Sequence, residues 1–152
     1  MTVLLSGASG LIGSALSKAL KERGDAVTRL VRKEWSSEPG EILWDPGPGY
    51  IERGKLEDLD AAVHLSGENV GSGRWTERKK GEIIESRTCT TKLLCRTFSE
   101  LDTPPKTWVC ASATGYYGNC GDRKLDEDEP CGETFLAEVC RQWEEASHPA
   151  RN

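Results

Sequence analysis

The sequence lacks the features that mark membrane-spanning, secreted or nucleic-acid-binding proteins. No apolar run approaches the roughly 20 residues that a helix needs to span a bilayer, and no basic segment precedes an apolar stretch at the N-terminus. The net charge of −5 argues against general binding to nucleic acid. A chain of 152 residues with 36% hydrophobic and 30% charged residues is typical of one globular domain. We therefore expect a single cytoplasmic domain over residues 1–152, with no nucleic-acid or membrane partner.

The six cysteines also lack the spacing of a disulfide framework or a zinc site, because none of them forms a C-x-x-C pair. Four lie where the pattern predicts a helix or a strand: Cys89, Cys95, Cys110 and Cys140. Small buried side chains in a reducing compartment are therefore the favoured interpretation, and no metal is expected. Cys120 and Cys131 lie in a loop-like stretch, where one of the two thiols could be exposed.

Short apolar segments alternate along the chain with helical patterns. The expected strands are residues 2–6, 26–31, 41–44, 61–65 and 107–111. The expected helices follow the first strand, run from Thr76 to about Glu100, and cover Glu133 to Ala146, with loops at 45–49 and 115–130. This alternation predicts an α/β fold, a Rossmann-like doubly wound parallel sheet of about five strands with helices on both faces. Ligands of such sheets bind at the carboxyl ends of the strands.

Three glycines spaced three apart follow the first strand: Gly7, Gly10 and Gly13. A helical pattern begins at once, and its apolar face carries Ile12, Ala15, Leu16, Ala19 and Leu20. Glycine permits a sharp turn, a close approach of the backbone to a ligand, and tight packing of helix on strand. The helix N-terminus then offers unpaired N–H groups and a positive dipole end to a phosphate. This order of strand, glycine turn and helix predicts a dinucleotide pyrophosphate site, with an ordinary βα turn as the alternative.

The end of the second strand carries basic residues where NAD-binding domains carry an acid for the ribose 2′-hydroxyl. Arg29, Arg32 and Lys33 come first here, and Glu34 only after them. Arginine can hold a 2′-phosphate by forked, charge-assisted hydrogen bonds, whereas a carboxylate would repel it. The sequence therefore favours NADP as the cofactor, with Arg32 contacting the 2′-phosphate. A solvated basic turn is the alternative, and it applies more readily to Lys33.

Arg87 falls on the apolar face of the long expected helix, between Ile83 and Thr90. A guanidinium in that place needs an anionic or carbonyl partner, which the cofactor or the carboxylate of Glu82 could supply. A structural salt bridge at the helix edge is the alternative. His64, in the fourth expected strand, is interpreted as a core or strand-end histidine rather than a catalytic one.

Hydroxyl groups follow the fifth expected strand, at Ser112, Tyr116 and Tyr117. A hydroxyl at the carboxyl end of a strand beside a cofactor can polarise a substrate carbonyl. A nearby tyrosine can exchange a proton there only if its pKa is lowered well below about 10. The alternative interpretation of Tyr116 and Tyr117 is that they are aromatic side chains that pack a loop.

Six motifs run through nearly the whole chain. They are Gly7-x-x-Gly10-x-x-Gly13, His64-Leu65-Ser66-Gly67-Glu68-Asn69, Arg74-Trp75-Thr76, Ser86-Arg87, Ser112-Ala113-x-Gly115-Tyr116-Tyr117-Gly118, and Phe135-Leu136-Ala137-Glu138-Val139-Cys140 with Trp143-Glu144. Together they resemble the atypical short-chain dehydrogenase/reductase superfamily, and within it the NAD(P)-dependent epimerase-like branch of epimerase family proteins, related to nucleoside-diphosphate-sugar epimerases. The resemblance implies a Rossmann fold, NADP binding and a small-molecule substrate.

The resemblance also implies which residues contact the cofactor. These are Gly7, Ser9, Gly10, Leu11, Ile12, Gly13, Arg32, Leu65, Ser66, Gly67, Glu82 and Arg87. The active site of the superfamily pairs a serine or threonine with Tyr-x-x-x-Lys. Ser112 matches the serine, but Phe135 and Val139 occupy the tyrosine and lysine positions, and neither side chain can exchange a proton.

Members of this family continue for roughly as many residues again. The chain is therefore expected to correspond to the N-terminal NAD(P)-binding part, with the C-terminal substrate domain absent. The fifth expected strand would then lie at an exposed edge of the sheet, through which the chain could self-associate.

Three functions stay open on these grounds. The first is an NADP-dependent oxidoreductase or epimerase-like enzyme acting on a carbonyl or sugar-nucleotide substrate, with Ser112 and Tyr116 or Tyr117 carrying the proton chemistry. The second is a non-catalytic NADP(H)-binding module, which the residues Phe135 and Val139 favour. The third is an inactive truncated domain.

Overall fold

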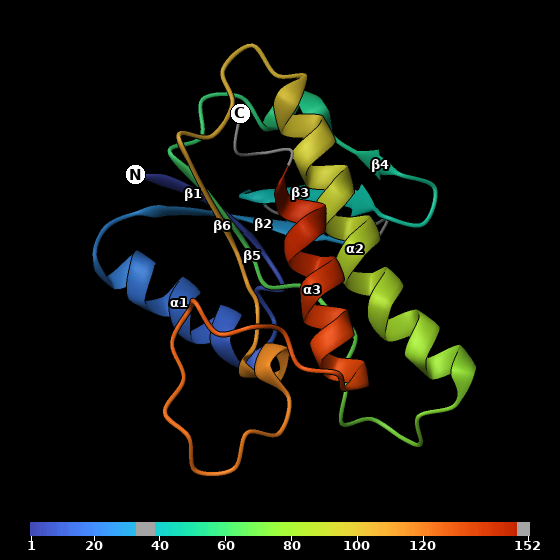
Figure 1. Cartoon of the computed structure of the whole chain (residues 1–152). Coiled ribbons are helices and arrows are strands. Elements are labelled where there is room, and N and C mark those ends of the chain that lie inside the picture. Colours follow the sequence, from blue (N-terminus) through green and yellow to red (C-terminus); the bar gives the residue numbers. More distant parts are fainter. Residues whose placement is uncertain (33–38, 149–152) are drawn as a thin grey trace.

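The computed structural model describes residues 1–32 and 39–148, so Lys33 and Glu34 lie outside the described residues. A sheet of six strands in the order β4-β3-β2-β1-β5-β6 forms the centre of the molecule (Figure 1). The strands are β1 Thr2–Ser6, β2 Ala26–Val31, β3 Glu41–Asp45, β4 Tyr50–Ile51, β5 Ala61–His64 and β6 Thr107–Cys110. All neighbouring pairs are parallel except β3 with β4. The fold is thus the Rossmann-like parallel sheet that the sequence predicts.

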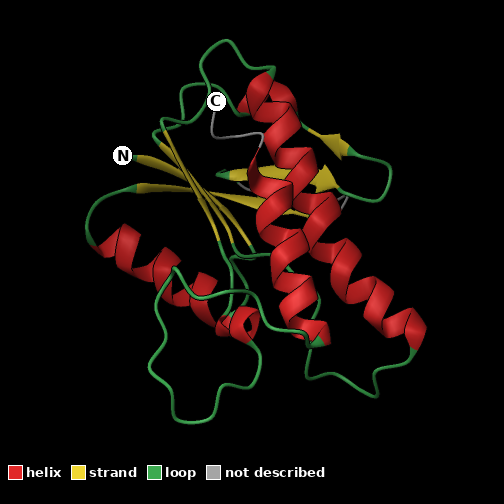
Figure 2. Ribbon diagram, viewed as in Figure 1, coloured by secondary structure: helices red, strands yellow, loops and turns green. Residues whose placement is uncertain are grey.

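Three helices cover the two faces of this sheet. Helix α1, Leu11–Glu22, lies on one face, and α2, Glu77–Ser99, packs beside α3, Phe135–Ser147, on the other (Figures 1 and 2). Thr76 caps the N-terminus of α2 and Thr134 caps that of α3, because each threonine hydroxyl accepts a hydrogen bond from a backbone N–H of the first turn. Two short 3-10 helices, η1 at Arg53–Lys55 and η2 at Thr114–Tyr117, interrupt the loops.

The main core lies between the sheet and α2. Leu4, Ile42 and Ala62 point from three strands toward Leu94 and Phe98 of the helix, and all five are nearly inaccessible to solvent. Side chains alternate along a strand, so Val3 and Leu5 of β1 point to the opposite face. Both are also buried. The sheet is therefore apolar on both sides at its centre, as a parallel sheet requires.

The strands end within one residue of the predicted bounds, but three short elements and one helix face differ. Strand β4 and the helices η1 and η2 were not predicted, because two to four residues carry no readable periodicity. In α1, Gly13 and Leu20 are buried, whereas the predicted core residue Ile12 is 69% exposed. The buried face of α1 is shifted by one residue from the predicted face, because the glycine turn fixes how the helix packs on the sheet.

Among the described residues, the cysteines form no disulfide bond with one another. Cys95 and Cys140 are buried, and Cys110 is partly buried, as predicted. Cys89 is exposed, which corrects the expectation for that residue, because it lies on the side of α2 that faces away from the sheet core. Within residues 1–32 and 39–148, no helix is both long enough and apolar enough to cross a membrane.

Candidate functional site

The turn between β1 and α1 is built from contacts that only glycine allows. Gly7 has a φ of +70°, and a Cβ there would lie 2.8 Å from the backbone of Leu65. A Cβ on Gly13 would lie 2.1 Å from the carbonyl oxygen of Gly7. The N–H of Gly10 donates to that same carbonyl at 3.0 Å. These contacts let α1 pack closely against the end of β1, and β1 against the loop that follows β5.

The first turn of α1 has no side-chain cap, in contrast to the other two long helices. Gly10 occupies the N-cap position and offers no side-chain acceptor. The N–H groups of Leu11, Ile12 and Gly13 have no hydrogen-bond partner in the described chain, since the first helical bond is donated by Ser14. Three unpaired donors and the positive end of the helix dipole thus meet at the carboxyl edge of the sheet.

An open cleft of about 480 Å³ lies beside this turn. Its walls come from the glycine turn, the end of β2, one residue of β3 and the start of the loop after β5. The lining residues are Gly7, Ala8, Ser9, Gly10, Arg29, Leu30, Val31, Arg32, Trp44, Leu65, Ser66 and Gly67. Seven of the residues predicted to contact the cofactor are therefore brought together around one cleft.

The two arginines of the cleft have different partners. Arg29 is paired with Glu41 at 2.6 Å, so its guanidinium is held against β3. Arg32 is exposed and lies 5.9 Å from the centre of the Trp44 ring, within the range of a cation–π contact. No described carboxylate is hydrogen-bonded to Arg32. The guanidinium of Arg32 therefore keeps its donors for a ligand in the cleft.

A buried chain of hydrogen bonds supports the far wall of the cleft. The N–H groups of Leu65 and Ser66 donate to Ser6 Oγ at 3.1 and 3.4 Å, and Ser6 Oγ lies 2.6 Å from Nδ1 of His64. Thr90 Oγ1 lies 3.1 Å from Nε2 of His64 and donates to the carbonyl of Ser86 at 2.7 Å.

This arrangement assigns the state of His64. Ser6 accepts from two N–H groups and donates to Nδ1, so Nε2 carries the proton and donates to Thr90. The ring is completely buried, stacked on Trp108 and edge-on to Trp44, and burial lowers its pKa to about 4. His64 thus lies in the core, as predicted, its ring is neutral, and it links the loop after β5 to α2.

Arg87 joins the same loop to both α2 and α3. Its guanidinium donates to the carbonyls of Ile83 at 3.0 Å and Glu68 at 3.1 Å, and it lies 5.1 Å from the centre of the Trp143 ring. A Cβ on Gly67 would lie only 3.1 Å from that guanidinium. Burial lowers the pKa of Arg87. The predicted carbonyl partners are present.

The other partner predicted for Arg87, the carboxylate of Glu82, is not bonded to it in the described chain. Glu82 is paired with Arg78 one helical turn away at 3.0 Å, because both side chains lie on the outer surface of α2. The carboxylate that interacts electrostatically with Arg87 is that of Glu68, which is paired with Lys79, and this pairing lowers the pKa of Glu68. Glu82, Leu11 and Ile12 do not line the cleft, although Leu11 and Ile12 contribute backbone donors beside it.

A second cavity, of about 350 Å³, lies at the carboxyl end of β6. It is lined by Ser112, Ala113, Thr114, Tyr116, Tyr117, Glu127 and Glu144. The three residues predicted to be catalytic are therefore neighbours. Ser112 Oγ donates to Glu144 Oε1 of α3 at 2.5 Å, and the rings of Tyr116 and Tyr117 meet edge to face.

The charges around this cavity affect whether its tyrosines could exchange a proton with a substrate. Partial burial and the nearby carboxylates of Glu127, Asp126 and Glu144 raise the pKa of Tyr117. The lowered pKa that a tyrosine base requires is therefore not met at Tyr117. A raised pKa keeps the phenol protonated, so Tyr117 can act as a hydrogen-bond donor in this cavity but not as a base at neutral pH.

The positions of the Tyr-x-x-x-Lys motif lie at the start of α3. Phe135 packs edge-on against Trp75, with a ring separation of 5.4 Å, and Lys80 lies 5.6 Å from its ring centre. Val139 is buried in the core. The first of these positions is thus an aromatic contact and the second a packing residue.

Several residues of the two cavities were not predicted from the sequence. Trp44 was interpreted as packing, yet it also forms the floor beneath Arg32. Glu144 belonged to a quoted motif but received no role. Its spacing was informative, because Glu144 continues the stripe of Ala137 and Cys140 on the buried side of α3. A carboxylate on such a stripe signals a specific partner.

Comparison with known proteins agrees with this architecture. Residues 3–137 match the family described as NAD dependent epimerase/dehydratase. The chain belongs to that family. An epimerase family protein of Mycobacterium leprae is 40% identical over 149 residues, which are 98% of this chain and 48% of that protein. The resemblance to the epimerase-like branch is thereby confirmed.

Two solved structures of this family superimpose on the chain. The crystal structure of human epimerase family protein SDR39U1 (isoform 2) with NADPH has a TM-score of 0.82 and 38% identity, and covers 97% of this chain and 48% of that one. A nucleoside-diphosphate sugar epimerase from Corynebacterium glutamicum has a TM-score of 0.82 and 39% identity, and covers 99% of this chain and 31% of that one. The chain spans about half the length of the curated relatives it matches.

Proposed function

We propose that this chain binds NADP(H) in the cleft between the glycine turn and Arg32. The observation that carries the proposal is the cleft itself, in which uncapped helix donors, a glycine cradle and a guanidinium that no described carboxylate hydrogen-bonds converge. The pyrophosphate would lie on the N–H groups of Leu11, Ile12 and Gly13, where a Cβ on Gly7 or Gly13 would prevent the approach of the backbone.

The choice of NADP over NAD rests on the end of β2. Arg29 is already neutralised by Glu41, so Arg32 is the described cation with donors to spare for a 2′-phosphate. The relative whose structure was solved with NADPH supports the same choice. The proposal therefore assigns cofactor preference to Arg32.

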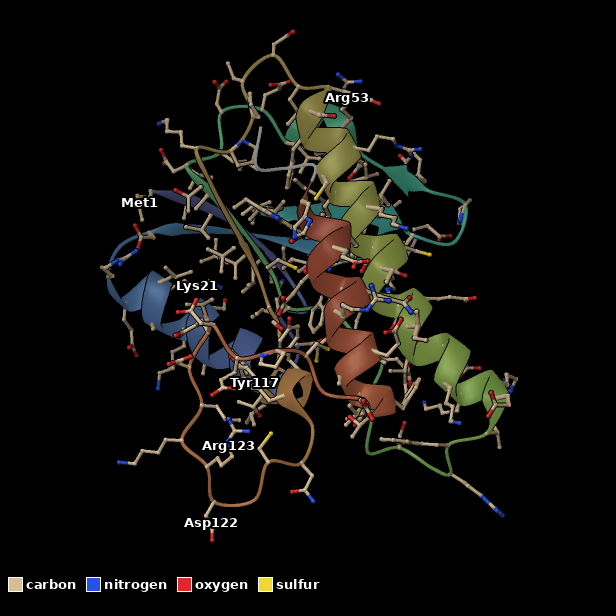
Figure 3. All side chains as sticks on the ribbon, in the orientation of Figure 1. Met1, Lys21, Arg53, Tyr117, Asp122 and Arg123 are labelled. Carbon is tan, nitrogen blue, oxygen red and sulfur yellow. The ribbon has the colours of Figure 1, made fainter. Side chains whose placement is uncertain are left out.

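Calorimetric titration with NADPH and NADH tests this assignment. We expect Arg32→Ala to weaken NADPH binding by roughly tenfold or more, the loss of one charge-assisted contact, and to leave NADH binding within about threefold. Arg53→Ala is the matched control, because Arg53 (labelled in Figure 3) does not line the cleft and forms its ion pair with Glu100. An equal loss for both nucleotides would refute the role of Arg32.

Within the whole protein, we propose an oxidoreductase or epimerase-like enzyme that acts on a carbonyl or sugar-nucleotide substrate. NADP(H) would supply hydride transfer. On substrate binding, Ser112 would turn its hydroxyl from Glu144 and donate its hydrogen bond to the substrate oxygen, and Tyr116 or Tyr117 would be the nearest phenol donors. Turnover of a substrate panel by the full-length protein tests this proposal, and loss of that turnover in Ser112→Ala identifies the serine.

A non-catalytic NADP(H)-binding module is the second candidate, and Phe135 and Val139 favour it because neither can move a proton. Tight NADPH binding without turnover by the full-length protein would support this candidate. An inactive domain that binds no nucleotide is the third. A cooperative melt that NADPH shifts upward would reject it, since a ligand stabilises only a state that binds it.

A further inference from the structure

The carboxylates of α3 differ in how they are neutralised. Glu138 and Glu145 both pair with Arg141, at 2.5 Å each. Glu144, adjacent in sequence to Glu145, points to the other side of the helix and forms no ion pair with any residue in 1–32 or 39–148. It accepts one hydrogen bond, from Ser112, to one of its two oxygens. This partly buried carboxylate is thus not neutralised by an ion pair with a described residue, and its second oxygen is available for another partner.

The surroundings of Glu144 reinforce that charge. The seven residues that line the cavity include no lysine, arginine or histidine. Glu127, which also lines the cavity, is a second carboxylate with no ion pair among the described residues. Partial burial and these carboxylates raise the pKa of Tyr117, so its phenol stays protonated. A ligand carboxylate or phosphate in this cavity would meet like charge, and an ammonium group would meet opposite charge.

The remaining wall is hydroxylic. Ser112, Thr114, Tyr116 and Tyr117 each bring a group that both donates and accepts hydrogen bonds. Such a wall is complementary to a ligand that is itself rich in hydroxyl groups. The volume of about 350 Å³ is at the lower end of the range of ligand pockets, which suits a small polyol rather than a nucleotide.

We propose that this cavity takes the reacting end of the substrate, that the end is an ammonium-bearing hydroxy compound such as an amino alcohol or amino sugar, and that Glu144 makes the selection. The inference rests on the proposed function, because it places the substrate next to Ser112. Glu144 is a specificity-determining residue in this scheme. One oxygen accepts the hydroxyl of Ser112 in the absence of substrate, and the other receives the ammonium group of the ligand.

Three ligands of matched length test the selection: glucamine carries an ammonium group, sorbitol is neutral, and gluconate carries a carboxylate. Each is titrated into the chain at neutral pH, with and without saturating NADPH, and binding is followed by calorimetry or by ligand-observed NMR. We expect glucamine to bind more tightly than gluconate by roughly tenfold, with sorbitol between them, and the gap to shrink as salt is added.

Variants on one helix separate Glu144 from its surroundings. Glu144→Gln keeps the shape and a hydrogen-bond acceptor for Ser112, and we expect it to bring the three affinities within roughly threefold of one another. Glu145→Gln is the matched control, because it removes the same charge one residue away but outside the cavity, and it should keep the order. NADPH affinity should be unchanged in both variants.

The outcomes separate the two proposals. Gluconate binding as tightly as glucamine, an order that survives Glu144→Gln, or no binding of any of the three while NADPH binds would each overturn this inference alone. The expected order without any binding of NADPH would overturn the proposed function alone.

Discussion

The glycine turn leaves no room for a methyl group at Gly13. The Cβ of an alanine there would lie 2.1 Å from the carbonyl oxygen of Gly7, a distance at which the backbone of the turn must move. We expect Gly13→Ala to abolish measurable NADPH binding and to lower the free energy of unfolding by about 2 kcal/mol or more. Thermal melts with and without NADPH measure both effects.

Gly81 is the control for this substitution. It lies inside α2, and a Cβ there would meet nothing within 4 Å. Gly81→Ala should therefore stabilise the chain by about 0.5–1 kcal/mol, the helix propensity difference, and leave NADPH binding unchanged. Wild-type affinity in Gly13→Ala would show that the turn does not hold the nucleotide.

His64 gives the second prediction at this scale. Burial lowers its pKa from 6.5 in the unfolded chain to about 4 in the folded one, so the unfolded state takes up a proton first as the pH falls. The contribution of His64 to stability is complete above pH 6.5 and declines between 6.5 and 4. Roughly 3 kcal/mol of the free energy of unfolding is lost over that window.

Histidine NMR signals measure this directly, because the chain has only two histidines. His148→Gln removes one signal and leaves that of His64, which should stay in its neutral position down to about pH 4. Urea unfolding at pH 7 and pH 5 should then show a smaller loss in His64→Gln than in the wild type. A His64 signal that titrates near 6.5 would contradict the buried hydrogen-bond chain.

Single residues were predictable from the sequence where the chemistry is local. The spacing of Gly7, Gly10 and Gly13 sufficed for the turn. The neutral state of His64 and the ion-pair-free state of Glu144 depend on groups that lie 26 to 58 residues away in sequence, such as Thr90, Ser6 and Ser112. No local pattern contains those partners, so these roles required the fold.

At the scale of elements, Arg87 is the joint between three of them. Its fork binds the loop after β5 and the backbone of α2 at once, and its flat face lies on Trp143 of α3. Lysine keeps the charge but lacks the planar fork. We expect Arg87→Lys to lower the free energy of unfolding by about 1–3 kcal/mol and to weaken NADPH binding, because Gly67 and its neighbours lose their support.

Arg96→Lys is the control for this prediction. Arg96 lies on the same helix, is exposed and forms no ion pair with the described residues. Both substitutions replace arginine with lysine, so they differ only in the contacts that Arg87 makes. Chemical denaturation and NADPH titration of both variants provide the comparison. Equal stabilities would mean that Arg87 contributes no more than a surface cation.

Elements were predicted from periodicity as far as periodicity extends. The five longer strands and both threonine-capped helices appear in place, because each has a buried stripe or a capping side chain of its own. Strand β4 exists only because β3 offers it hydrogen-bonding partners across a turn. The rotated face of α1 has the same kind of cause, since tight contacts of Gly13 with the turn set how the helix lies on the sheet.

At the scale of the whole molecule, β6 is an edge strand of the sheet, and among the described strands it pairs with β5 alone. Its outer side presents unpaired backbone N–H and C=O groups within the described chain, and Val109 is 46% exposed on it. Such an edge is a template for another strand. We therefore propose that the isolated chain self-associates by pairing β6 with β6 of a second copy. This proposal is independent of the two cavities.

Sedimentation velocity over a range of concentrations measures this association. The wild-type chain should shift toward a dimer as concentration rises. Val109→Lys places a charge on the edge, where natural sheets use lysine to prevent pairing, and should keep the chain monomeric. Val109→Thr keeps the β-branched shape without the charge and should still dimerise. A monomer at every concentration in the wild type would exclude pairing through β6, because the unpaired edge is present whether or not NADPH is bound.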